Sequence, residues 1–158
     1  DLALRVLGES PRPSSTRLQL VPGANIGSRS KLQAEVRRKL EPTLPASAVT
    51  HLADTFGTLW NEVVSIDEQQ QLLPGGITLE AEVRYAARRE MTATLADIVL
   101  RRLDLGTGAG PSEVLLERCS RIAAEELGWT DAQRQQQIRQ VRASYPFANP
   151  ASQQGRAA

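Results

Sequence analysis

The stretch between residues 72 and 106 constrains the fold most, because nearly every position in it has a local structural role. A Leu-Pro-Gly-Gly turn precedes Thr78, which is predicted to cap a helix with acidic residues in its first turn, at the positive end of the helix dipole. Thr94 is predicted to start a second helix with apolar residues three and four positions apart. The sequence therefore predicts two helices packed closely across a tight turn. The predicted buried stripe of the first helix is Leu79, Val83, Ala86, Ala87 and Met91.

The composition of the 158-residue chain favours helices elsewhere as well. Hydrophobic residues make up 41% of the chain but aromatic residues only 4%, so the core must come from Leu, Val, Ile and Ala. That composition suits packed helices better than a β-sandwich, which is rich in β-branched and aromatic residues. We therefore predict an all-α fold: a compact bundle of about six to seven short helices preceded by an extended N-terminal arm.

Local signals predict where several of these helices begin and end. Ser30 with Gln33 has the spacing of a capping box, in which each residue bonds the backbone of the other, and so does Thr130 with Gln133. Gly128 follows an amphipathic run and is predicted to end it. These signals predict helix starts near residues 30 and 130.

The chain divides into four predicted segments. Residues 1–8 have the pattern of the last turns of a helix, which we expect to begin before Asp1. Residues 9–24 form a proline-containing linker and arm, in which residues 17–21 alternate polar and apolar and predict a short strand or extended segment. Residues 25–146 form the helical domain, and residues 147–158 a polar tail.

The charged and reactive residues exclude several functions. With 19 basic and 18 acidic residues the net charge is +1, so we expect no nucleic-acid partner. Cys119 is the only cysteine and is predicted to be a buried, inert thiol in a protein of the cytoplasm. His51 is expected on the surface or at the boundary of the core, and one His with one Cys makes no usual zinc site. No apolar run is long enough to span a membrane.

The sequence offers no candidate catalytic, cofactor-binding or metal-binding residue. The glycine-rich segment 106–110 follows a predicted helix and lacks the spacing of a phosphate-binding loop. Glu82, Glu90, Arg101 and Arg102 flank the tight turn between the two helices described first. We predict a structural role for these four residues, as cross-helix ion pairs or as a clamp between a carboxylate and the backbone.

Several motifs occur together and in order: DLALRVLG, LQLVPGA, AEVRYAARREM, TLADIVLRRLDLG and IAAEELGWTDAQ. Over residues 1–145 the chain thereby resembles the C-terminal helical domain of FAD-dependent, respiratory glycerol-3-phosphate dehydrogenases. The resemblance implies a parent enzyme that oxidises sn-glycerol 3-phosphate to dihydroxyacetone phosphate and passes electrons to quinone. The FAD-binding and substrate-binding residues of that family lie upstream of Asp1, so the resemblance implies that this chain alone is inactive and binds no FAD.

The resemblance also implies partners and a location. Residues 1–8 would be the end of a helix that leaves the FAD-binding catalytic domain of the same polypeptide. The helical domain would cap that catalytic domain, contribute to a homodimer, or both. The parent would be cytoplasmic, lying peripherally on the cytoplasmic face of the inner membrane, where it meets the membrane surface and quinone. Two other interpretations stay open from the sequence: a free-standing helical module that binds protein or DNA, and a helical enzyme complete in itself.

Overall fold

The computed structural model describes residues 2–10, 15–107 and 110–145, and in these ranges the protein is an all-α bundle, as predicted. A single isolated β-bridge, between Leu72 and Leu79, is the only β-type pairing in the described ranges. The α-helices are α1 (Leu2–Val6), α2 (Arg29–Leu40), α3 (Ala46–Phe56), α4 (Trp60–Val64), α5 (Glu80–Arg89), α6 (Glu113–Leu127) and α7 (Asp131–Ala143). The shorter elements are the 3-10 helices η1 (Thr16–Leu18) and η2 (Gly57–Leu59) and the π-helix η3 (Asp97–Arg102).

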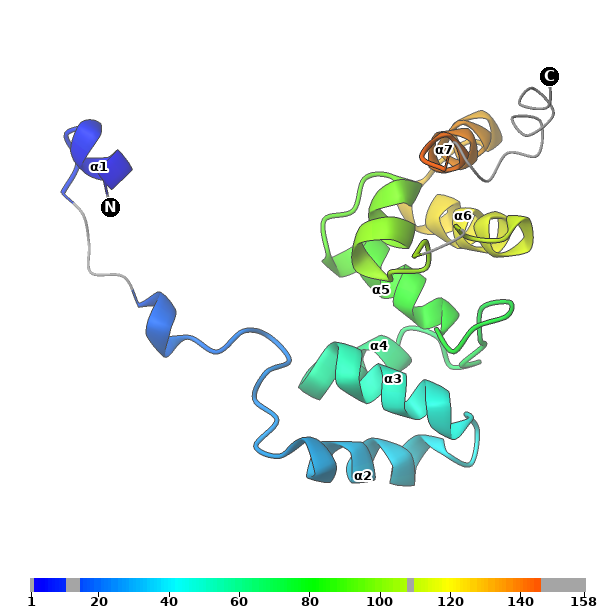
Figure 1. Cartoon of the computed structure of the whole chain (residues 1–158), viewed down its shortest axis with the longest axis horizontal. Coiled ribbons are helices and arrows are strands. Elements are labelled where there is room, and N and C mark those ends of the chain that lie inside the picture. The colour runs from blue at the N-terminus through cyan, green and yellow to red at the C-terminus, as the bar shows by residue number, and fades with distance from the viewer. Residues whose placement is uncertain (1, 11–14, 108–109, 146–158) are drawn as a thin grey trace, which may run out of the picture.

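The bundle has two hydrophobic cores that meet at α5. The first core is formed mainly by α2, α3 and α4, and the second by η3, α6 and α7. Helix α5 contributes Ala81 and Tyr85 to the first core and Val83 and Ala86 to the second. Figure 1 shows α5 between the α3–α4 pair and the α6–α7 pair. Because both faces of α5 are covered, a change inside this helix affects both halves of the bundle.

The helix ends in the C-terminal half agree with the local signals. The Thr130 hydroxyl accepts from the backbone N–H of Gln133, and the Gln133 side chain accepts from the backbone N–H of Thr130 at 2.8 Å, so this capping box is confirmed. Gly128 ends α6 in the left-handed conformation with φ of 68°. Glycine reaches that conformation without the strain that a Cβ atom would cause.

Two predicted helix caps are not formed, although the first of these helices starts near residue 30, as predicted. Helix α2 begins at Arg29, and no side chain caps it; the Gln33 amide instead donates to Asp54 of α3 at 2.9 Å, so a tertiary contact replaces the predicted capping box with Ser30. Helix α5 begins at Glu80, with Leu79 rather than Thr78 at the cap position.

The predicted position of Met91 on a buried stripe is also wrong. Helix α5 ends at Arg89, and the chain turns so that Met91 has φ of 52° and is 95% exposed. The Thr92 hydroxyl donates to the carbonyl of Ala86 at 3.0 Å and holds this turn against the end of α5. The turn therefore places Met91 in solvent, whereas the helical spacing predicted it in the core.

The predicted strand at residues 17–21 is not formed. Thr16–Leu18 is a 3-10 turn, and Gln19 is extended with φ of −97° and ψ of 121°. A lone strand is not stable without a neighbour for its backbone groups, and no described segment lies along this one. Residues 19–21 thus pair with no strand in the described ranges, whereas the predicted tail at 147–158 lies outside the described residues.

Candidate functional site

Glu82 of α5 is the most deeply buried charged side chain of the described residues, at 0% exposure. Its Oε1 accepts from the backbone N–H of Leu79 at 2.8 Å, which caps α5. Its Oε2 lies 3.0 Å from Nε2 of His51 in α3. A buried carboxylate is stable only when such partners replace its lost water. Glu82 therefore joins α3 to the start of α5.

His51 lies at the edge of the core, where only 22% of its side chain is exposed. Its other ring nitrogen, Nδ1, is 3.4 Å from the Thr55 hydroxyl. The pKa of His51 is raised above its ordinary value, chiefly by the hydrogen bond to Glu82, and this effect outweighs the opposing effect of burial. Asp54 adds a smaller attraction for the imidazolium form. This environment favours the charged histidine.

Replacing His51 by glutamine is expected to have a pH-dependent effect on stability. Because the pKa of His51 is raised on folding, the charged pair with Glu82 stabilises the fold fully below the unfolded pKa of about 6.5. That contribution is lost as the pH rises through the folded pKa. The difference in unfolding free energy between wild type and His51→Gln, from urea denaturation between pH 5.5 and 9, should therefore be largest at the acidic end. A difference that is constant with pH would contradict this assignment.

Further ion pairs join α5 to α6. Glu80, only 4% exposed, accepts from Arg118 at 2.5 and 2.6 Å. Glu126 accepts from Arg84 at 2.9 Å and from Arg88 at 2.5 Å. The pKa of Glu126 is lowered chiefly by its hydrogen bond to Arg88. These contacts fix the position of α5 along α6.

The four residues singled out from the sequence do not form one cluster. Glu82 contacts Leu79 and His51 as described, and none of the other three residues takes part. Glu90 lies 3.9 Å from Arg102, and burial raises the pKa of Glu90 while Arg102 opposes that rise. Arg101 pairs with Asp97, one turn earlier in η3. Their structural role stays a prediction.

No sequence pattern indicates the partners of these carboxylates. Glu82 and His51 are 31 residues apart, and Glu80 and Arg118 are 38 apart. Such pairs depend on how the helices pack and not on spacing along one helix. Glu126, which binds two arginines, was missed for the same reason.

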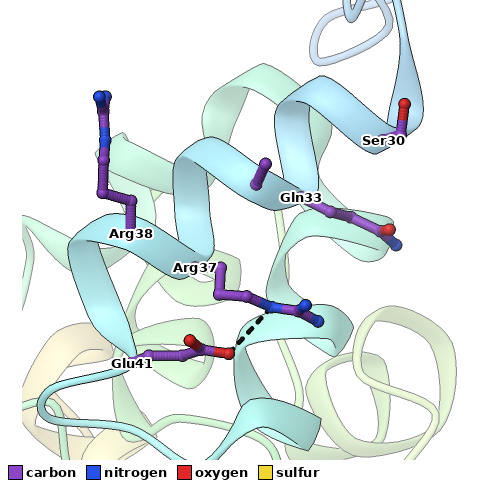
Figure 2. Close-up of a pocket in the computed structure, with 6 residues that line it drawn as sticks. Ser30, Gln33, Arg37, Arg38 and Glu41 are labelled. Atoms are coloured by element: carbon purple, nitrogen blue, oxygen red, sulfur yellow. Dashed lines mark ion pairs between the residues drawn. The ribbon is translucent and has the colours of Figure 1, made fainter.

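The surface of α2 carries a shallow depression, shown in Figure 2, whose lining side chains are mostly charged or polar. Arg37 pairs with Glu41 at 2.9 Å across one helical turn, and both side chains are about half exposed. In Figure 2, Arg38 points away from this pair. An exposed pair of this kind contributes little to stability and creates no enclosed site. The remaining lining residues are Ser30, Gln33 and Ala34.

Neither a metal-type cluster nor a reactive cysteine is found among the described residues. No group of three or more His, Cys, Asp or Glu side chains in these ranges could hold a metal ion. Cys119 is buried, as predicted, and burial raises its pKa to about 12, so its thiol stays protonated and unreactive. Every buried side-chain N or O atom of the described residues already has a hydrogen-bond partner. None of the helices in these ranges has both the length and the apolar composition of a membrane span.

The fold and these contacts define the class of protein: an all-α bundle domain whose buried polar groups in the described ranges bind one another. The chain belongs to the family described as the C-terminal domain of alpha-glycerophosphate oxidase, which matches residues 14–134. It is also 26% identical over 104 residues to a mitochondrial glycerol-3-phosphate dehydrogenase of Arabidopsis thaliana. That match covers 63% of this chain and 16% of the relative. No solved structure matches the chain.

The comparisons confirm the resemblance drawn from the sequence motifs. The family match includes the arm at residues 17–21 and both helices of the 72–106 stretch. Because the chain spans about one sixth of the relative's length, the activity of a whole protein is a separate question.

Proposed function

We propose that this chain is the C-terminal accessory domain of an FAD-dependent glycerol-3-phosphate dehydrogenase. The parent oxidises sn-glycerol 3-phosphate to dihydroxyacetone phosphate and passes the electrons to quinone. The observation that carries the proposal is the family match over residues 14–134, together with the similarity to a glycerol-3-phosphate dehydrogenase. The self-paired charges of α5 and α6 suit a domain that supports a catalytic body and holds no substrate itself.

In this proposal the FAD and the substrate are bound by the preceding part of the same polypeptide. The helical domain packs on that body and contributes to dimer contacts. The parent lies peripherally on the cytoplasmic face of the inner membrane, where quinone accepts the electrons. We assign no residue of this chain to FAD, substrate or quinone.

The isolated 158-residue chain is expected to show no oxidation of glycerol 3-phosphate, with or without added FAD. A protein expressed from the complete native reading frame should contain FAD and reduce an artificial electron acceptor when glycerol 3-phosphate is added. The measurements are the flavin absorbance spectrum and the rate of acceptor reduction for the two proteins side by side.

Either of two results would contradict the proposal. Turnover by the isolated chain would place an active site in these helices. A complete protein that contains no flavin, or that contains flavin but does not oxidise glycerol 3-phosphate, would remove the proposed parent activity. Glycerol without the phosphate serves as the control substrate, because it separates oxidation of the phosphorylated compound from general alcohol oxidation.

A further inference from the structure

Apolar side chains of the N-terminal arm are exposed to a degree unusual for a segment inside a family domain. Leu18 is 87% exposed, Leu20 is 68% exposed and Val21 is 72% exposed. The family match begins at residue 14 and therefore includes all three. Figure 1 shows this part of the chain running away from the helical bundle before α2 begins. Exposed apolar side chains that gather in one place are typical of contact surfaces, and these three lie within four residues of one another.

The end of this arm is fixed to the bundle. The backbone N–H of Thr58 donates to the carbonyl of Gly23 at 3.0 Å, directly after the turn that follows Val21. Gly23 and Gly57 approach so closely that a Cβ atom on Gly57 would lie 2.0 Å from the Gly23 oxygen. The arm thus leaves the bundle from a defined point at the end of α3.

We propose that residues 18–21 dock on the flavin-binding body of the same polypeptide, adding an extended segment to it. This inference rests on the proposed function, because it requires that body to be present. Gln19 already has extended backbone angles, and outside the η1 turn no backbone hydrogen bond is seen for Gln19 or Leu20 in the described ranges. An extended segment without a strand partner and with apolar side chains on alternate positions is what strand addition to a sheet edge uses.

The flavin-binding body of the parent fits this arm better than an anionic lipid surface does. A domain described as C-terminal is joined to the rest of its polypeptide through its N-terminal end, which is where the arm lies. Arg17 is the one charged residue between residues 15 and 21, whereas attraction to an anionic lipid surface relies on clusters of basic residues. The occupant must instead supply apolar contacts and backbone partners, as a folded protein body does.

Trypsin provides a direct test, because it cuts after Arg17, next to the proposed docking segment. Cleavage at this bond should be fast in the isolated chain and at least about tenfold slower in the complete protein, where docking protects the arm. The variant Leu20→Asp/Val21→Asp should lose this protection in the complete protein. The rate is followed by mass spectrometry of the fragment that begins at Leu18, and each variant's rate in the isolated chain corrects for changes in intrinsic cleavage.

Val114→Asp is the matched control, because Val114 is 66% exposed, close to the value for Leu20, but lies in α6. It should keep the protection at Arg17 in the complete protein. In the isolated chain, the arm variant and the control should both unfold at the wild-type temperature. Unfolding of the isolated arm variant at a lower temperature would overturn the inference, since the arm would then pack within this domain.

The inference also fails if the complete wild-type protein is cut after Arg17 as fast as the isolated chain, or if the arm variant is protected like wild type. It fails as well if the native reading frame encodes no further body. Flavin content and glycerol 3-phosphate oxidation are measured on the same protein. Loss of those properties with the protection intact would overturn the proposed function and identify another body as the docking partner.

Discussion

Replacing Glu82 by alanine is expected to lower the free energy of unfolding by about 3 kcal/mol, the cost of removing one partner from a buried, hydrogen-bonded pair. The change leaves the Leu79 N–H and the His51 ring without the acceptor that each has at 2.8 and 3.0 Å. It also leaves a cavity where a side chain with 0% exposure stood between the two cores. Urea denaturation of the isolated domain, followed by circular dichroism, measures the loss.

Glu68→Ala is the control for this experiment, because Glu68 is exposed and no partner is seen for it in the described part of the chain. It should change the unfolding free energy by no more than about 0.5 kcal/mol. Glu82→Gln separates shape from charge, since the amide can still accept from Leu79 but carries no charge for His51. If Glu82→Ala unfolds at the same urea concentration as Glu68→Ala, the contacts of Glu82 with Leu79 and His51 do not stabilise the fold.

The elements that the sequence predicted correctly are those determined by neighbouring residues. The Thr130–Gln133 capping box and the glycine stop at Gly128 need only a few adjacent positions, and both are present. The composition, which is poor in aromatic residues, likewise predicted the all-α class, because a prediction from composition requires no knowledge of particular contacts. The family resemblance rested on ordered motifs, and the match to residues 14–134 confirms it.

The features that the sequence could not predict depend on contacts between distant segments. Gln33 has the spacing of a capping residue, but Asp54 of α3 binds its amide, and only the packing of α2 on α3 brings the two together. Met91 continues the helical spacing of α5, but the turn held by Thr92 and Ala86 ends the helix first. The partners of Glu80 and Glu82 come from other helices in the same way. Glu82 was recognisable from the sequence as a candidate, whereas its partner His51 and the pair of Glu80 with Arg118 were not.

Replacing Gly57 by alanine is expected to lower the free energy of unfolding by about 2–4 kcal/mol, because it combines two costs. Gly57 has φ of 55° and ψ of −130°, angles that residues with a Cβ atom rarely adopt. The added Cβ would also lie 2.0 Å from the carbonyl oxygen of Gly23, a backbone atom that cannot move without shifting the arm. The hydrogen bond from Thr58 to that carbonyl would be displaced as well.

Gly75→Ala separates these two costs. Gly75 also has positive φ, at 73°, but a Cβ atom there would meet nothing within 4 Å. This control should cost only about 1 kcal/mol, the strain of the backbone angle, so the excess for Gly57→Ala measures the contact between the arm and the end of α3. Equal losses in urea denaturation would show that the arm is not held at Gly23. The proposed docking of residues 18–21 requires that the arm be held where it leaves the bundle. A larger loss of stability for Gly57→Ala than for Gly75→Ala would therefore also support that proposal.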